Sequence, residues 1–449
     1  MRIGAITRVP YATAYKLKVN RMKKLLSIGT LLFSWVMLQA QNRFPKPDFE
    51  SGYQYPELHY AIPNETLWVV LDLFMLVLLM SIVVWAVYKK HTRKPIFWVS
   101  VISVAYFGFF RSGCVCSIGS IQNIALAMVD STYHLPLTVL LFFILPILFA
   151  FLFGRVFCAG VCPFGALQEL VNVKNYRISK AVTATLGIIP WLYLIFAVLY
   201  AVTRSRFIIC QFDPFIGIFR LGGDVGLLLF GALLLILSVF TGRPFCRFLC
   251  PYGALLSLFS SVSIWKIRLS RKACINCELC HNSCPVDAIR SPYANKVKES
   301  RKEGVRRLLG YLVVLPLMIA AGAFLMRSAS SDLSRANKDV RLYDMVERHE
   351  ANPEEELSLE LEAFYGQGRT LEELTSAYEA KLDEFRFYST IAGGLIGLVI
   401  GLALIRLSVK RTRKQYEINH AACVACACVS VIALRIRIVL NCVNHQNHE

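Results

Sequence analysis

Seven apolar runs dominate the sequence and restrict the folds it can adopt. An α-helix needs about 20 apolar residues to cross the hydrocarbon core of a bilayer. A chain that is 56% hydrophobic is also too apolar for an ordinary soluble protein. The runs cover residues 67–88, 95–110, 135–153, 181–203, 225–241, 308–326 and 388–407, of which the second and fifth are the shortest. We therefore predict an all-α polytopic membrane protein with about seven transmembrane helices.

Lysine and arginine residues lie beside these runs and predict their orientation. Cytoplasmic loops of membrane proteins are enriched in Lys and Arg. Counted from the first run, four basic clusters fall on one side: Lys89–Lys94, Lys174–Lys180, Lys266–Lys272 and Lys410–Lys414. This distribution accounts for the net charge of +19, so we expect a multi-pass protein of a bacterial inner membrane and no nucleic-acid partner.

The N-terminal residues have the pattern of a secretory leader. Met22-Lys23-Lys24 begins a basic stretch, and residues 25–38 are apolar, as in a signal peptide. A first membrane anchor is the alternative. We expect translation to begin at Met22 and interpret residues 1–40 as a start extension plus signal peptide. Residues 41–66 are polar and are predicted to be periplasmic.

A run of cysteines, C-I-N-C-E-L-C-H-N-S-C-P, predicts the redox chemistry. Its spacing, C-x2-C-x2-C-x3-C-P, is that of a bacterial ferredoxin loop, in which three thiolates hold one [4Fe–4S] cluster and the fourth reaches a second cluster. The ligands are Cys274, Cys277, Cys280 and Cys284, in a predicted cytoplasmic loop of residues 270–300. Zinc sites usually place a long spacer between two cysteine pairs. The overlapping C-x-x-C-H pattern lies on the cytoplasmic side, where haem is not attached, and no histidine lies in an apolar run, so we expect no haem.

An internal repeat occupies the predicted transmembrane core, residues 67–260. G-R-V-F-C-A-G-V-C-P-F-G-A-L-Q-E-L from Gly154 and G-R-P-F-C-R-F-L-C-P-Y-G-A-L-L-S-L from Gly242 agree at ten of seventeen positions. Proline favours the first helical turn, so the second cysteine of each motif is predicted at a helix N-cap. The cysteines of the two motifs are candidate ligands of one metal centre: Cys158, Cys162, Cys246 and Cys250. Helix starts with unligated thiols are the alternative.

Three further cysteines are predicted on the outer side. Cys114 and Cys116 belong to a degenerate copy of the repeat, R-S-G-C-V-C-S-I-G-S-I-Q, and Cys210 begins C-Q-F-D-P-F. They form a candidate redox or metal site. A disulfide is equally compatible with an oxidising compartment.

The last two apolar runs form a predicted transmembrane pair, residues 308–407, around a periplasmic segment of different character. Residues 327–387 are acidic, and Thr370-Leu-Glu-Glu373 is typical of a capping box at a helix start. A docking or covering element and a solvated helical hairpin both fit this pattern.

Together the paired C-x3-C-P motifs and the ferredoxin loop resemble the NosR/NapH-type membrane polyferredoxins, over residues 67–290 and again near the last run and the tail. The resemblance implies an electron-transfer component of an oxidoreductase system, with a quinone or flavoprotein donor and a periplasmic reductase or redox partner. It also implies a second ferredoxin motif, which begins here at Cys423 and Cys426. NosR-like relatives carry an FMN domain, for which this chain has neither the attachment motif nor the room, so we expect no covalent FMN.

The tail, residues 410–449, departs from that family. After Cys426 the chain reads A-C-V-S-V-I-A-L and loses the third and fourth cysteines of the motif. A change of reading frame would restore the full spacing, so we interpret the tail as a frameshifted motif in which Cys428 and Cys442 are poor substitutes. We expect two [4Fe–4S] clusters in an intact homologue and one here.

The predicted function is electron transfer between cytoplasmic [4Fe–4S] clusters, in a small ferredoxin-type module, and a quinone pool or a periplasmic reductase. Two alternatives remain. One is an assembly factor that reduces a metal such as copper during oxidase biogenesis, and the other is a membrane redox sensor.

Overall fold

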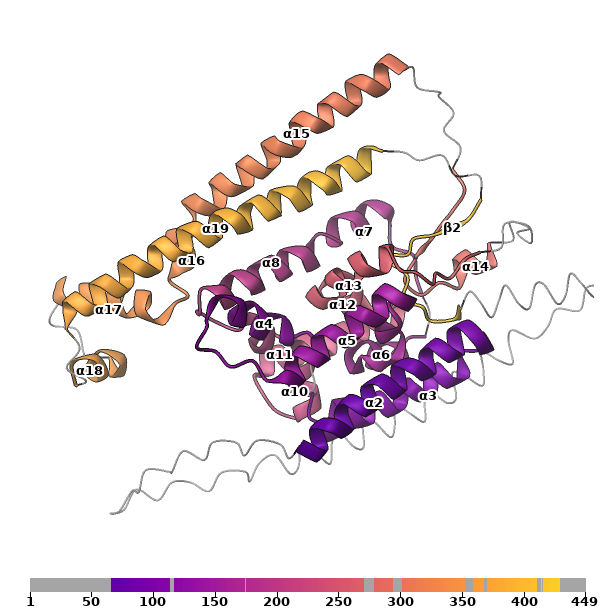
Figure 1. Ribbon diagram of the computed structural model, residues 1–449, viewed down its shortest axis with the longest axis horizontal. Helices are drawn as coiled ribbons and strands as arrows, with labels where there is room; N and C mark the ends of the chain where they lie inside the picture. Colours follow the sequence, from indigo (N-terminus) through magenta and orange to yellow (C-terminus); the bar gives the residue numbers. More distant parts are fainter. Residues whose placement is uncertain are drawn as a thin grey trace, which may run out of the picture. The chain divides into compact units, whose positions relative to one another are not determined.

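The computed structural model describes residues 66–113, 117–173, 175–269, 278–293, 301–351, 358–366, 370–409, 413 and 415–428. These residues are almost entirely helical, and a single two-stranded sheet occurs among them (Figure 1). The predicted signal peptide, the start at Met22 and the periplasmic segment lie outside the described residues, apart from Thr66.

Among the described residues, four helices are long and apolar enough to cross a membrane: Leu67–Lys90, Ala181–Val202, Lys302–Ser328 and Leu371–Ser408. A fifth span is formed if Pro214–Arg220 and Val225–Phe240, which meet at 101°, count as one broken helix. The second and third predicted runs are shorter apolar helices, Lys94–Phe110 and Leu137–Phe153. A mostly helical protein with several membrane-spanning segments is therefore confirmed, whereas the count of seven stays a prediction.

The described part of the membrane core consists of the following helices, of which those labelled η are π-helical. In chain order the helices are α2 (Thr66–Trp85), η2 (Ala86–Lys90), α3 (Lys94–Ser103), η3 (Val104–Phe110), α4 (Ser120–Val129), α5 (Leu137–Phe153), η4 (Phe157–Val161), α6 (Pro163–Val171), α7 (Lys180–Leu186), α8 (Ile189–Val202), α9 (Ile208–Gln211), α10 (Pro214–Arg220), α11 (Val225–Phe240), α12 (Pro244–Phe248) and α13 (Pro251–Ser261). The two halves of the repeat start α6 and α13. Around them pack α3, α5, α8 and α11, so that the repeat lies in the main hydrophobic core.

Beyond the core, α14 (Leu279–Asn282) precedes a long helical hairpin of α15 (Arg301–Ser328) and α19 (Leu371–Ser408). The two helices lie side by side (Figure 1) and approach closely at glycines. A Cβ on Gly397 would collide with the backbone carbonyl of Met318, and one on Gly393 with that of Gly322. Small residues allow this close packing in membranes, where the hydrophobic effect between helices is weak.

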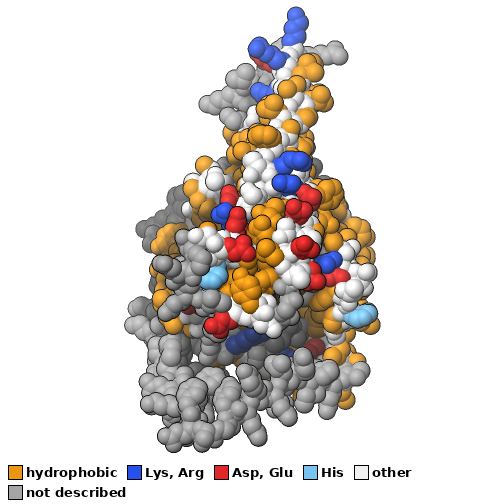
Figure 2. Space-filling view, turned by 90° about the vertical axis from the view of Figure 1, so that its left-hand side faces the viewer, with side chains coloured by type: hydrophobic (Ala, Val, Ile, Leu, Met, Phe, Trp, Pro, Cys, Tyr) orange, Lys and Arg blue, Asp and Glu red, His pale blue; other side chains and the backbone are white. Residues whose placement is uncertain are grey.

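Three short helices join the hairpin at one end: α16 (Ser330–Ser334), α17 (Lys338–Ala351) and α18 (Leu359–Gly366). With the start of α19 they bury a small cluster that includes Val346, Phe364 and Leu374. Thr370 is the N-cap of α19, and its Oγ1 accepts a hydrogen bond of 3.3 Å from the Glu373 amide, as the capping box predicts. Figure 2 shows acidic side chains around an apolar strip on this face of the molecule.

The sheet joins two segments that the hairpin separates in sequence. Strand β1 (Ile289–Arg290) pairs antiparallel with β2 (Glu417–Ile418). A bridge between Tyr293 and Arg413 extends the pairing, and the Asn419 amide donates to the Ala288 carbonyl at 2.7 Å. The end of the first ferredoxin motif is thereby held against the start of the second.

Candidate functional site

The two C-x3-C-P motifs begin helices in the same way. Cys162 is the N-cap of α6 and Cys250 is the N-cap of α13, each with proline as the first helical residue. The Gly253 amide donates to Cys250 Sγ at 3.2 Å. The predicted N-cap positions of both cysteines are therefore confirmed.

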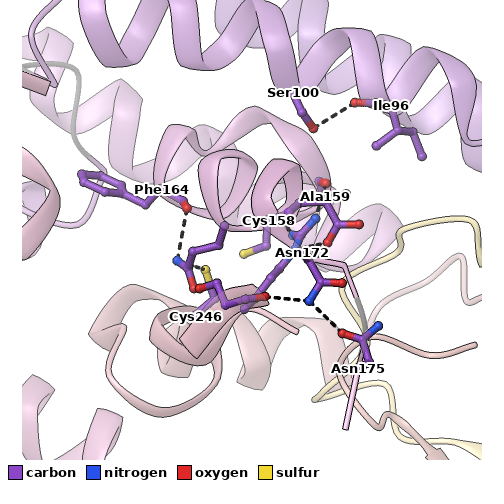
Figure 3. Close-up of polar contacts among 12 residues, drawn as sticks. Ile96, Ser100, Cys158, Ala159, Phe164, Asn172, Asn175 and Cys246 are labelled. Atoms are coloured by element: carbon purple, nitrogen blue, oxygen red, sulfur yellow. Dashed lines mark hydrogen bonds and ion pairs between the residues drawn. The ribbon is translucent and has the colours of Figure 1, made fainter. Parts of the chain in front are cut away.

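The four cysteines of the repeat lie in one buried region. All are under 10% exposed. Cys246 Sγ lies 3.4 Å from the place that a Cβ would take on Gly165, near the start of α6, and Gln168 Nε2 lies 3.7 Å from the same sulfur. Figure 3 shows Cys158 and Cys246 in this region, where the two motifs meet. The structure thus brings the repeats together, as their shared sequence predicts.

The buried thiols of the two repeats raise one another's pKa. Burial raises the pKa of Cys246 to about 11, and a negative charge on Cys158 raises it further. Burial also raises the pKa of Cys162 and of Cys250 well above the ordinary thiol value, followed by the charges of the other cysteines. Thiolates that repel one another in a dry site are stabilised when a metal centre supplies positive charge.

Two arginines connect the repeats. Arg243, fully buried in the second motif, donates to the carbonyl oxygens of Cys158 and Ala159 in the first, the latter at 2.7 Å. Its Nε lies 3.1 Å from Glu169 Oε2. Arg155 of the first motif lies against the second motif: a Cβ placed on Gly253 would be 3.0 Å from its Nη2. Each repeat therefore contributes an arginine that lies against the other repeat.

A second set of thiols lines one apolar cavity in the paired ferredoxin segments. Its cysteines are Cys284, Cys423, Cys426 and Cys428. Ala425 and Ala427, on either side of Cys426, have φ of 50° and 58°, in the left-handed region that alanine rarely adopts. These turns allow Cys428, only two residues after Cys426, to be buried in the same cavity as the other three thiols.

The thiols in this cavity also shift one another's pKa. Burial raises the pKa of Cys423 to about 12, and burial together with the charge of Cys426 raises that of Cys284 to about 11. Cys428 and Cys426 are hydrogen-bonded. This bond lowers the pKa of Cys426 and raises that of Cys428.

The two thiol sets adjoin. Arg155 Nη1 donates to the Ala421 carbonyl at 3.2 Å, and its Nη2 lies 3.9 Å from Cys158 Sγ. Ser260, at the end of α13, donates to the His420 carbonyl at 2.8 Å. The segment that carries Cys423 and Cys426 is therefore bound directly to the two repeats.

Both thiol sets consist of cysteines, the residues that hold iron–sulfur clusters. No group of three or more His, Cys, Asp or Glu side chains among the described residues could hold one metal ion as placed. Four thiolates on one zinc ion must converge at about 2.3 Å from it. A cubane cluster distributes its cysteine ligands over several iron atoms, so these ligands do not have to converge on one point.

The structure describes only some of the remaining predicted ligands. Cys280 lies half-buried on α14, and Cys210 lies exposed on α9. Five cysteines lie outside the described residues: Cys114, Cys116, Cys274, Cys277 and Cys442.

Sequence reasoning missed several buried polar residues around these sites. Gln168, Arg155 and Arg243 were not singled out, although the Gly-Arg pair that opens each repeat was the available signal. It also missed Asp72, the single acidic residue in the first apolar run. Asp72 is 2% exposed, accepts from Tyr106 Oη at 2.8 Å and pairs with Arg111 at 2.7 Å.

Comparisons with known proteins agree with the cysteine geometry. A family model described as a 4Fe-4S binding domain matches residues 135–179 and 224–270, the two repeats. A second 4Fe-4S binding domain model matches residues 267–290. No solved structure matches the chain.

Three relatives illustrate the similarity. An uncharacterized protein of Methanocaldococcus jannaschii is 30% identical over 190 residues, 40% of this chain and 77% of its own length. The regulatory protein NosR of Stutzerimonas stutzeri is 30% identical over 207 residues, 42% of this chain but 28% of NosR. The ferredoxin-type protein NapH of Haemophilus influenzae is 26% identical over 175 residues, 37% of this chain and 61% of NapH.

The chain therefore spans less than two thirds of NosR and of NapH. With two matched 4Fe-4S domains, converging repeats and several membrane-spanning helices, the chain belongs to the NosR/NapH-type family of membrane polyferredoxins.

Proposed function

We propose that this protein carries electrons between cytoplasmic [4Fe–4S] clusters and a quinone pool or an outer reductase. The observation that supports this proposal most directly is the position of Arg155, which contacts the Cys158 thiol of one set and the carbonyl of Ala421, two residues before Cys423 of the other. Redox centres exchange electrons efficiently only when they lie close together. One thiol set belongs to the ferredoxin segments and the other to the membrane helices, so the pair forms a path from one to the other.

Under this proposal each set holds one cluster, which supplies the one-electron chemistry when it is bound. Cys284, Cys423, Cys426 and Cys428 are the ligands in the ferredoxin cavity. Cys274, Cys277 and Cys280 remain the predicted ligands of a further cluster. The four repeat cysteines hold the centre in the core, where burial excludes water and Arg155 and Arg243 supply positive charge.

The proposal retains the predicted sidedness. The basic clusters next to the spans support a cytoplasmic position for the ferredoxin segments and an outer position for residues 327–387. The acidic face formed by α16–α18 then lies on the side where an outer redox partner would bind (Figure 2).

The experiment is cluster analysis of anaerobically purified full-length protein and of single-cysteine variants. We expect iron and acid-labile sulfide, and reduced-state EPR signals. Cys426→Ser should remove the signal of the ferredoxin cavity, and Cys246→Ser that of the core. Cys442→Ser is the matched control and should change neither. Zinc without sulfide would refute the cluster assignment.

Electron transfer itself is tested with the intact protein reduced by dithionite. A water-soluble quinone should reoxidise it, and Cys246→Ser should slow this step while leaving the ferredoxin-cavity signal in place. If Cys246→Ser protein is reoxidised at the unaltered rate, the core thiols are not on the path. Sensing or metal assembly would then be the better interpretation.

A further inference from the structure

A buried glutamine connects the first repeat to a candidate ligand of the second. Gln168 lies on α6 and is fully buried. Its Oε1 accepts a hydrogen bond from the Phe245 amide at 3.1 Å, and its Nε2 donates to the Phe164 carbonyl, also at 3.1 Å. Nε2 also lies 3.7 Å from Cys246 Sγ, within reach of an N–H···S hydrogen bond. One side-chain amide therefore contacts two backbone groups and one thiol.

The two backbone contacts fix which way the Gln168 amide faces. The oxygen and nitrogen of a glutamine side chain are assigned from the hydrogen bonds that they make. Turning the amide over would set its NH₂ group against the N–H of Phe245 and its oxygen against the carbonyl of Phe164. Two buried backbone groups would then be left without their partners, which is costly. The amide nitrogen, and not the oxygen, therefore faces the Cys246 sulfur.

The second repeat has leucine in place of this donor. Alignment of the two motifs sets Leu256 at the position of Gln168, and Leu256 is also fully buried. A leucine side chain cannot donate a hydrogen bond. Cys158, the counterpart of Cys246 in the first repeat, lies 3.9 Å from Arg155 Nη2 of its own repeat. A side-chain amide at this position therefore belongs to one repeat and not to both.

The contact has a consequence for a redox centre held by these thiols. An added electron increases the negative charge on a cluster and on its sulfur ligands. A hydrogen-bond donor aimed at a ligand sulfur stabilises the reduced form more than the oxidised form, so it raises the reduction potential. Water does not screen the donor in a buried site, which strengthens this effect.

We propose that Gln168 is a positioning residue that donates an N–H···S hydrogen bond to the ligand sulfur of Cys246 and thereby raises the reduction potential of the core centre. The inference rests on the proposed cluster in the core and adds a residue that adjusts its potential. A potential raised in this way favours transfer of electrons from the ferredoxin cavity to the core.

The test is a redox titration of the purified full-length protein, followed by EPR, in wild type and two variants. The core signal is the one that Cys246→Ser removes. Gln168→Leu introduces the residue found in the second repeat and removes the donor. We expect the equilibrium constant for reduction of the core centre to fall roughly three- to tenfold, which corresponds to a potential lower by about 30–60 mV for one electron.

Gln122→Leu is the matched control. Gln122 is also fully buried, and its Oε1 accepts the Ile209 amide at 2.9 Å while its Nε2 donates to the Ala197 carbonyl at 3.2 Å. Its substitution therefore removes backbone bonds like those of Gln168 and should leave the potential of the core centre unchanged. If the role of Gln168 is only structural, the two variants will titrate at the same potential.

A second measurement uses wild-type protein and does not depend on the stability of Gln168→Leu. In protein labelled with ¹⁵N in the glutamine side chains, pulsed EPR of the reduced core centre should show a nitrogen coupling through the N–H···S bond. Labelled Gln122→Leu protein should keep this coupling. If Gln168→Leu loses the core cluster, the coupling in wild type decides.

The inference is overturned if labelled wild type shows no nitrogen coupling, or if Gln168→Leu titrates at the wild-type potential. A core signal with either of these results overturns this inference alone. Absence of a core signal from wild type overturns the proposed core cluster together with it.

Discussion

Replacing Arg243 by methionine tests whether one buried guanidinium holds the two repeats together. The Arg243 side chain is 1% exposed and donates to two carbonyl oxygens of the first motif and to Glu169. Methionine keeps most of the apolar volume and removes every one of these bonds. The change therefore isolates the polar contribution.

The expected loss of stability depends on which partners Glu169 keeps after the substitution. Removing one partner of a buried ion pair typically costs about 3–5 kcal/mol. Glu169 is 12% exposed and keeps Arg93 as a second partner, so we expect the lower end, about 3 kcal/mol. At 1.4 kcal/mol for each factor of ten, local opening of the site becomes roughly a hundredfold more frequent.

Alkylation of the buried thiols measures this opening. In protein freed of metal by a chelator and kept reduced, Cys158 reacts only when the site opens, so its rate reports the opening equilibrium. Arg93→Met is the matched control, because Arg93 pairs with the same carboxylate from a side chain that is 49% exposed. An exposed pair is worth under about 1 kcal/mol, so Cys158 should react less than about fivefold faster in that variant.

The reasoning fails if Arg243→Met and Arg93→Met accelerate the alkylation of Cys158 equally. It also fails if Cys158 reacts at the wild-type rate in Arg243→Met protein. Thermal unfolding of the same samples separates local opening from global loss of structure.

Three other substitutions probe the remaining parts of the fold. Thr370→Ala should destabilise the start of α19 by about 1 kcal/mol through loss of its cap, measured as earlier proteolysis of the α17–α19 region. Gly397→Leu should cost about 1–3 kcal/mol in thermal unfolding, because its side chain meets the backbone of α15, whereas Gly310→Leu, with open space around it, should cost far less. Asp72→Asn should lower the unfolding temperature strongly by leaving Arg111 without its charge partner, and Asp332→Asn, whose side chain is 76% exposed, should not.

The long spans and the helix starts were predictable because their signals are local. An apolar run of 20 residues and a cysteine followed by proline each predict structure without knowledge of the rest of the chain. The fifth run was only partly predictable. A hydropathy average does not register the bend between α10 and α11, where Leu221 and Gly223 have φ of 52° and 129°.

The parts of the site that sequence missed depend on contacts distant in sequence. Gln122 and Gln168 resemble ordinary polar residues of a helix until their partners, Ile209 and Phe245, are known. The burial of Cys428 beside Cys284 required left-handed backbone at two alanines, a conformation that alanine does not predict. The lost motif spacing therefore made Cys428 look unsuitable as a ligand.

The pairing of β1 with β2 also sets an order of events on the ribosome. Ile289 leaves the exit tunnel long before Ile418, and the whole α15–α19 hairpin is synthesised between them. The thiols of the ferredoxin cavity cannot come together until that hairpin has been synthesised and directed to the membrane. The cavity is therefore expected to form late in folding, and a variant whose hairpin fails to insert into the membrane is expected to lack the closed cavity.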